Sequence, residues 1–291
     1  MLDNYLLEEL TTFAETGTLA KTAAQLNITQ PTVTRGMQKL EADWGVRLFD
    51  RQPNRITLTP TGKLAAQEAA ALLQAQHQAI QKVRNFDRSQ HQLTIGSTLP
   101  GPLMLLQHLQ PQLPAQTTIA TDLLPDQNLT QALQNRDYTL ILTSQVPVAS
   151  DITTQSLGTE DLAVNLNQFM YQANQADISF AELKDLSFLV IADIGPWRDI
   201  IQRAIPGAKF LYQDQREAFR EISAYTDFPY FSSSFSPFDP LLTPSPKTNT
   251  VRLPIRDQSA HMPVYATYLQ ANQTVVTPII RLLRKSWPKS H

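Results

Sequence analysis

Residues 19–35 read LAKTAAQLNITQPTVTR. Small and apolar residues recur there at helical spacing as far as Leu26, and Asn27-Ile28 follows as a turn. Thr29 then stands directly before Gln30-Pro31, and a capping threonine with a proline in the first turn is a strong start signal for a helix. The stretch therefore predicts two helices joined by a tight turn, with the second helix beginning at residue 30.

The segments on either side extend this pair of helices. Before it, Asp3 as N-cap and Gly17 as C-terminal stop bound a helix whose apolar face consists of Leu6, Leu7, Leu10, Phe13 and Ala14. The helix that begins at residue 30 ends at Gly45, and its inward positions are Val33, Met37, Leu40 and Trp44. Its polar residues Gln30, Thr34, Arg35 and Gln38 are left facing outward.

This pattern predicts a winged helix-turn-helix. The major groove of DNA admits one helix, and Arg, Gln, Ser and Thr side chains read its base edges. Two short strands, Val46–Phe49 and Ile56–Leu58, are expected around residues 51–55, which contain Arg51 and Arg55. A basic tip of this kind suits phosphates or the minor groove.

Several further motifs accompany residues 19–35 in a fixed order. They are Leu40-Glu41, Gly45-Val46, Leu48-Phe49-Asp50-Arg51 and Leu58-Thr59-Pro60-Thr61-Gly62. Together with residues 19–26 and 29–35, these motifs resemble the signature of the LysR-type transcriptional regulators over about sixty residues. A structural use of the helix-turn-helix, for packing alone, is the alternative.

The resemblance assigns DNA-binding roles to single residues. It aligns Gln30, Pro31, Thr34 and Arg35 with major-groove contacts and Arg51 with a wing or backbone contact, and the full set of candidates adds Thr32, Gln38 and Arg55. The sequence departs from the family at Gly36, where Gln is usual, and at Asn54, where Arg is frequent and Arg55 can substitute. A helical glycine costs about 1 kcal/mol, and Gly36 is expected to remove one polar contact.

A long helix is predicted over residues 60–86. Its apolar stripe consists of Leu64, Ala71, Leu72, Ala75, Ala79, Val83 and Phe86. A helix of this length spans about 40 Å, which is too long to bury against a small winged domain alone. The resemblance implies a linker helix that pairs with its mate in a dimer, and packing within the chain is the alternative.

Strand and helix patterns alternate after residue 90. The first series predicts strands at 93–96, 117–123 and 138–143 and helices at 100–109 and 127–135; the second predicts strands at 188–192, 209–212 and 229–232 and helices at 196–204 and 214–225. Leu162–Leu166 and Val264–Tyr268 are expected to cross between the two series, and helix 277–285 to return to the first. This order resembles the periplasmic-binding-protein fold of LysR-type effector domains, while the Ser- and Pro-rich residues 233–248 are expected to form a loop.

The ligand of such a domain belongs in the crevice at the carboxyl ends of the strands. Hydroxyls of Ser97 and Thr98 at the start of a helix predict an anion site, and Asp193, Pro196 and Trp197 follow a strand of the second lobe, with Thr143 as a weaker candidate. These residues are interpreted as the effector site of a small polar metabolite, a carboxylate by preference, although Asp193 could receive an amine. The alternative is that the hydroxyls only cap the helix and Trp197 is core.

Composition excludes several functions. The chain has 291 residues and a net charge of −2, and it has no Cys, which removes disulfides, cysteine metal sites and thiol chemistry. GxSxG, HExxH, Walker and GxGxxG motifs are absent, and the five histidines have no metal-ligand spacing, so no enzyme, metal or cofactor is expected. The N-terminus lacks a secretory pattern and no apolar run reaches 18 residues, so a cytoplasmic location without membrane contact is expected.

The predicted fold class is α/β with an N-terminal all-α winged helix-turn-helix and a C-terminal two-lobed effector domain. Its domains are 1–59, which binds DNA, the linker helix 60–90, and 91–291, with lobes of about 91–163 plus 267–291 and 164–266. The resemblance implies a transcriptional regulator that binds an interrupted palindrome in double-stranded DNA as a dimer or tetramer and responds to a small-molecule effector. The alternatives are a ligand-independent DNA-binding protein whose lobes serve assembly, and an enzyme or transport protein.

Overall fold

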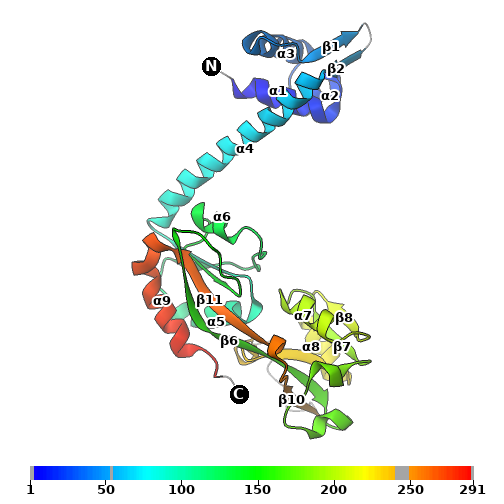
Figure 1. Cartoon of the computed structure of the whole chain (residues 1–291), viewed down its shortest axis with the longest axis vertical. Helices are drawn as coiled ribbons and strands as arrows, with labels where there is room; N and C mark the ends of the chain where they lie inside the picture. The colour runs from blue at the N-terminus through cyan, green and yellow to red at the C-terminus, as the bar shows by residue number, and fades with distance from the viewer. Residues whose placement is uncertain (1–2, 53–54, 240–248, 290–291) are drawn as a thin grey trace. The chain divides into compact units, whose positions relative to one another are not determined.

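The computed structural model of the chain describes residues 3–52, 55–239 and 249–289 (Figure 1). The chain divides into two compact units, Met1–Arg84 and Asn85–His291. Position 54 and most of the predicted loop 233–248 lie outside the described residues.

In the described part of the first unit, three helices and a two-stranded wing precede the long helix that ends it. The helices are α1 (Asn4–Thr16), α2 (Leu19–Gln25) and α3 (Gln30–Trp44), and the wing pairs β1 (Phe49–Gln52) with β2 (Arg55–Leu58) antiparallel. The predicted inward faces of α1 and α3 are buried, and the ring of Phe13 meets that of Phe49 edge-on at 5.5 Å. The fold class is confirmed for this unit, although Ala14 is exposed instead of buried.

Local hydrogen bonds explain why these helices begin where the sequence indicates. The Thr18 hydroxyl accepts from the amide of Lys21, and the Thr29 hydroxyl accepts from the amide of Thr32. Asp3 occupies the N-cap position of α1, but its carboxylate pairs with Lys39 at 2.6 Å instead of capping the helix.

The wing is attached to α3 through Glu41. One carboxylate oxygen of Glu41 accepts from the backbone amides of Leu48 and Phe49 at 2.8 and 2.9 Å. The other oxygen pairs with Arg51 of β1 at 2.8 Å. These charge-assisted contacts fix the angle between the wing and α3.

Helix α4 (Pro60–Ser89) follows the wing directly. The small side chains of Ala65, Ala66 and Ala69 are buried against the core of the first unit. Other apolar side chains of the helix are exposed, namely Leu64, Leu72, Val83 and Phe86, of which Val83 is 71% exposed. Among the described residues, the guanidinium of Arg136 lies 4.9 Å from the ring of Phe86, and the other three side chains of the stripe remain exposed.

The second unit is built on a sheet with the strand order β4-β3-β5-β11-β6-β9-β7-β8. The strands are β3 (Leu93–Ser97), β4 (Thr117–Ile119), β5 (Leu140–Thr143), β6 (Ile152–Asn167), β7 (Ser187–Ile191), β8 (Lys209–Gln213), β9 (Tyr230–Ser233) and β11 (His261–Leu269). Strands β4, β3 and β5 are parallel in one half, and β8, β7 and β9 are parallel in the other. Both parallel sets carry short α-helices, as the alternating pattern predicts.

Strand β6 connects the two halves. Its first part pairs antiparallel with β11, and its second part pairs antiparallel with β9 and with β10 (Thr250–Pro254). The predicted crossing strand Leu162–Leu166 is therefore only the end of a strand of 16 residues, and β10 lies in a segment for which the sequence analysis predicts no strand. The prediction misses both because polar residues interrupt the alternation on which it relies.

Five helices pack on this sheet: α5 (Pro100–Leu109), α6 (Leu129–Gln134), α7 (Trp197–Ala204), α8 (Arg216–Tyr225) and α9 (Gln273–Ser286). Leu105, Leu106 and Leu109 of α5 and Val276, Ile279, Ile280 and Leu283 of α9 are buried in one continuous core. None of the described helices is both long and apolar enough to cross a membrane.

Candidate functional site

The outward face of α3 gathers most of the predicted DNA-binding residues. Gln30, Pro31, Thr32, Arg35 and Gln38 are exposed along this helix. Thr34 is half-buried, and its hydroxyl donates to the carbonyl of Gln30 at 3.0 Å. The first turn of α3 therefore presents amide, hydroxyl and guanidinium groups together.

The two wing arginines differ in their surroundings. Arg51 is held by Glu41, so part of its charge is compensated within the chain. Arg55 begins β2 opposite Gln52 in the register and is exposed. Arg55 is thus the more available cation for a phosphate, and Arg51 orients the wing.

Gly36 does not lie on the outward face, which corrects the expectation that it removes a polar contact. Gly36 is buried against α1, and a Cβ atom built there would come within 1.7 Å of Oε2 of Glu9. Glu9 is only 3% exposed, and its Oε2 has no hydrogen-bond partner among the described residues. The glycine makes room for a carboxyl group that the sequence analysis did not single out.

We expect the first unit to lose stability as the pH rises between about 4.5 and 7. Burial raises the pKa of Glu9 to about 7, above its ordinary value of 4.5, so the folded unit retains a proton that the unfolded chain releases. Within that interval the free energy of unfolding falls by up to about 1.4 kcal/mol per pH unit. Hydrogen exchange of the α1 and α3 amides, converted to protection free energies, measures this slope.

Glu9→Gln keeps the shape of the side chain and removes its proton equilibrium. The slope is expected to disappear in this variant, whereas Glu15→Gln, at an exposed position of the same helix, should leave it unchanged. An identical slope in wild type and Glu9→Gln contradicts the assignment.

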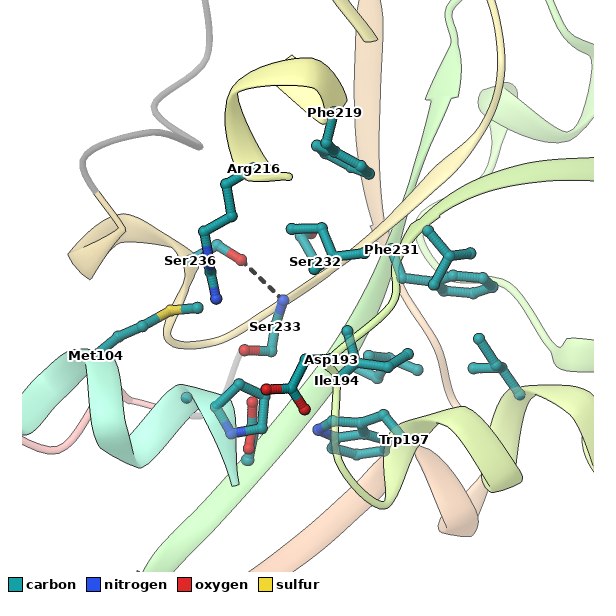
Figure 2. A pocket seen from close by; sticks show the side chains of 17 residues that line it. Met104, Asp193, Ile194, Trp197, Arg216, Phe219, Phe231, Ser232, Ser233 and Ser236 are labelled. Atoms are coloured by element: carbon teal, nitrogen blue, oxygen red, sulfur yellow. Dashed lines mark hydrogen bonds between the residues drawn. The ribbon is translucent and has the colours of Figure 1, made fainter. Parts of the chain in front are cut away.

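A cavity of about 70 Å³ lies in the second unit, where α5, α7, α8 and the strands β6, β7 and β9 meet (Figure 2). Its wall is mainly apolar and includes Met104, Ile194, Trp197, Phe219 and Phe231. Its polar side chains are Glu160, Asp193, Arg216, Ser232, Ser233 and Ser236. A second hollow of about 370 Å³ shares Met104, Asp193 and Arg216 with it.

The structure separates the predicted effector residues into two groups. Asp193 and Trp197 line the cavity, whereas Ser97, Thr98, Thr143 and Pro196 are not among its lining residues. The Ser97 hydroxyl donates to the carbonyl of Leu99 and accepts from its amide, at 2.8 and 3.0 Å. The Thr98 and Thr143 hydroxyls bond each other at 3.2 Å, and all three residues are buried.

The start of α5 is a weak anion site for a second reason. Pro100 and Pro102 have no N–H group. Among residues 100–102, which begin the helix, Gly101 is therefore the residue with a backbone N–H to offer to an anion. Oε1 of Glu160 already lies there, since a Cβ on Gly101 would come within 2.4 Å of it. The chain's own carboxyl group therefore packs against the residue that carries this amide.

Glu160 is the residue that the sequence analysis misses in this site. It is 1% exposed, and burial raises the pKa of its carboxyl group to about 7, against the opposing influence of Ser233 and Trp197 nearby. Oε2 of Glu160 and the indole Nε1 of Trp197 are buried and make no well-aligned hydrogen bond among the residues that the structure describes, although the two side chains lie close enough for Trp197 to lower the pKa of Glu160. Glu160 lies inside β6, and a glutamate within a buried strand would have indicated a buried acid. The predicted strand, however, begins only at Leu162, two residues after Glu160.

The described part of the chain contains no group of three His, Cys, Asp or Glu residues that could hold a metal ion. Among the described histidines, His261 pairs with a carboxylate: its Nδ1 lies 2.8 Å from Asp161 on the adjacent strand. That contact is a cross-strand pair.

Comparisons with known proteins agree with this architecture. Residues 6–63 match the family model described as bacterial regulatory helix-turn-helix protein, lysR family. The HTH-type transcriptional regulator TfdS of Cupriavidus pinatubonensis is 27% identical over 186 residues, which cover 62% of this chain and 63% of that protein. The match thus spans less than two thirds of that curated relative.

Two solved structures share the fold along nearly the whole chain. Full-length OxyR from Pseudomonas aeruginosa has a TM-score of 0.54 at 19% identity and covers 100% of this chain and 98% of its own. DarR from Vibrio fischeri, solved in complex with DNA, has a TM-score of 0.59 at 17% identity and covers 96% of this chain and 98% of its own. Both the helix-turn-helix and the curled α/β sheet therefore recur together in known regulators.

Proposed function

Because this chain belongs, through its helix-turn-helix, to the LysR-type regulators, we propose that it binds double-stranded DNA and regulates transcription in response to a small molecule. The observation that carries the proposal is the outward face of α3, where Gln30, Thr34 and Arg35 are presented together on a helix held by a capped turn. This face has the residue types that read base edges in the major groove.

The proposed docking places the first turn of α3 in the major groove and the wing along the backbone. Gln30, Arg35 and Gln38 are the base-reading candidates, and Thr34 reaches a base or phosphate as an acceptor because its proton is held by the Gln30 carbonyl. Arg55 contacts a phosphate, whereas Arg51 keeps the wing in place through Glu41. Pro31 and Thr32 shape the helix start.

We expect Arg35→Ala and Arg55→Ala to have different consequences. A bidentate base contact is worth about 1–3 kcal/mol of discrimination, so Arg35→Ala should bring operator and non-operator affinities closer together. Arg55→Ala should weaken binding to all sequences alike and reduce the slope of log affinity against log salt by about one. Gel-shift titrations at several salt concentrations, with DNA from upstream of the chain's own gene, measure both effects.

Arg88→Ala serves as the control, because this exposed arginine lies outside the helix-turn-helix and the wing. Unchanged specificity in Arg35→Ala together with an unchanged salt slope in Arg55→Ala contradicts the proposed docking.

The domain roles follow the same proposal. Residues 1–59 bind DNA, the helix of residues 60–90 pairs with its counterpart in a second copy, and residues 91–291 form the effector domain. The exposed apolar stripe of α4 supports the pairing. An interrupted palindrome is the matching operator, because a two-fold symmetric dimer presents two recognition helices to two half-sites.

The cavity of the second unit supports the ligand-responsive form of the proposal. A largely apolar cavity with a few convergent polar groups is the usual form of a small-molecule site. We place Asp193 and Trp197 at this site, while Ser97, Thr98, Thr143 and Pro196 act on it through the backbone that they hold. Addition of a cell extract to the gel shift tests the response: a change in mobility or affinity supports it, and identical shifts with all extracts favour a ligand-independent regulator.

A further inference from the structure

Two buried polar atoms in the cavity, on neighbouring side chains, make no well-aligned hydrogen bond with the described residues. Oε2 of Glu160 is an acceptor, or a donor when the acid is protonated, and Nε1 of Trp197 is a donor. Both residues line the cavity, and both are at least 98% buried. A buried polar group without a partner is costly, so the cavity offers a gain to any molecule that satisfies both atoms.

The charges around the cavity oppose an anion. Glu160 and Asp193 are its two acidic lining residues, and Asp193 has no ion-pair partner within the described ranges. Arg216 is the basic lining residue, and its guanidinium pairs with Asp239. The neighbouring hollow adds Asp214. A carboxylate entering here would meet the side chain of Asp193, and above pH 7 also the ionised carboxyl group of Glu160, at close range.

The start of α5 does not compensate the negative charge of these acids. Gly101 lies between two prolines at the beginning of α5, and the Glu160 carboxyl group already packs against it. The serine hydroxyls are partly committed as well, since Ser232 accepts from Asn165 at 2.8 Å and Ser236 accepts from the Ser233 amide at 2.9 Å. Figure 2 shows the latter bond.

From this arrangement we propose that the effector is an uncharged molecule with a short apolar body and a head that donates to Glu160 and accepts from Trp197, as a primary carboxamide does. The inference rests on the proposed function of the cavity as the effector site. The N–H of the amide meets Oε2 of Glu160, and its carbonyl meets Nε1 of Trp197. The apolar body lies against Met104, Phe219 and Phe231.

Size limits the probes to a few carbon atoms. An engineered cavity of about 150 Å³ holds benzene, and this cavity has about half that volume. A ligand with five or six non-hydrogen atoms must therefore extend its tail past Met104 into the neighbouring hollow of about 370 Å³. Butyramide, butyrate and butylammonium have similar lengths and differ in the charge and hydrogen-bonding capacity of the head. Affinities in the millimolar range are expected for ligands of so few atoms, because each atom contributes little binding energy.

The test is a titration of the full chain, labelled with ¹⁵N at tryptophan, with each of the three probes. The chain has three tryptophans, and Trp197→Phe identifies the indole N–H signal of Trp197. We expect butyramide to shift this signal and to bind at least tenfold more tightly than butyrate and than butylammonium. Binding of butyrate or butylammonium that is tighter than binding of butyramide overturns the proposal. A Trp197 signal that none of the three probes shifts also overturns it and leaves ordered water as the occupant of the cavity.

Glu160→Gln separates the charge of the residue from its shape. The variant is expected to bind butyrate at least tenfold better relative to butyramide than the wild type does. Glu221→Gln, at an exposed position of α8, is the matched control and should leave the ratio unchanged. An unchanged ratio in Glu160→Gln contradicts the role of its charge.

Gel shifts on the same samples distinguish the two proposals. DNA binding without a butyramide preference overturns the ligand class alone. If the folded wild-type protein does not bind DNA, the proposed function is overturned, whichever probe the cavity binds.

Discussion

The double variant Leu72→Glu and Ala79→Glu is expected to be monomeric and to lose at least a hundredfold in affinity for a two-half-site operator. Both positions lie on the exposed apolar stripe of α4, and Leu72 is 49% exposed. In a paired helix their carboxylates would be buried without partners, which is costly. Binding to two linked half-sites increases the affinity of a dimer for DNA by roughly 10²–10⁴ through effective concentration, and a monomer lacks this increase.

The control uses the same helix and the same introduced residue. Gln74→Glu with Gln81→Glu has the same seven-residue spacing, but both positions are exposed and polar. This variant should sediment as the wild type does and bind the long operator with little change. Sedimentation velocity and gel shifts on one-half-site and two-half-site DNA separate the outcomes. A dimer that persists in the Leu72→Glu, Ala79→Glu variant contradicts pairing through this stripe.

The helix-turn-helix could be predicted from the sequence because its determinants are local. Thr18 and Thr29 cap their helices through atoms three residues away, and Gly17 and Gly45 end helices with positive φ values of 71° and 68°. Such signals need no knowledge of distant segments.

The buried acids could not be predicted in the same way. The environment of Glu9 depends on Gly36, and that of Glu160 depends on Gly101 and Trp197. These partners are separated by 27 to 59 residues in the sequence. Only the packed fold brings them together, and the periodicity of a single segment contains no information about such distant partners.

The predicted effector residues failed to meet in one cavity for a related reason. From the sequence alone, hydroxyls at a strand end are expected to be available to a ligand. In the structure, the hydroxyls of Ser97, Thr98 and Thr143 form hydrogen bonds with one another or with the backbone. Asp193 and Trp197 do line the cavity because they follow the carboxyl end of β7, where the α/β rule places ligands.

Gly62→Ala is expected to destabilise the first unit by about 3 kcal/mol, although alanine is the better helix former by about 1 kcal/mol. A Cβ on Gly62 would come within 2.0 Å of the carbonyl oxygen of Leu48 and 3.0 Å of its carbonyl carbon. That oxygen accepts from the amide and hydroxyl of Thr59, and Leu48 is fully buried. Relief of the contact therefore requires a shift of backbone at the junction between the wing and α4.

Gly36→Ala provides the contrast that tests this reasoning. Its Cβ would meet Glu9 at 1.7 Å, but the contacted atom is the end of a flexible side chain, which can turn away. The loss of stability should therefore be smaller than for Gly62→Ala, where the contacted atoms belong to the backbone. Hydrogen exchange of the α1 and α3 amides measures the stability of both variants in the full chain, and Gln67→Ala, on the exposed face of α4, controls for helix propensity.

Because the wing moves with Leu48, Gly62→Ala should also weaken DNA binding at temperatures where the unit remains folded. A Gly62→Ala protein as stable as the wild type contradicts the close approach of α4 to the wing.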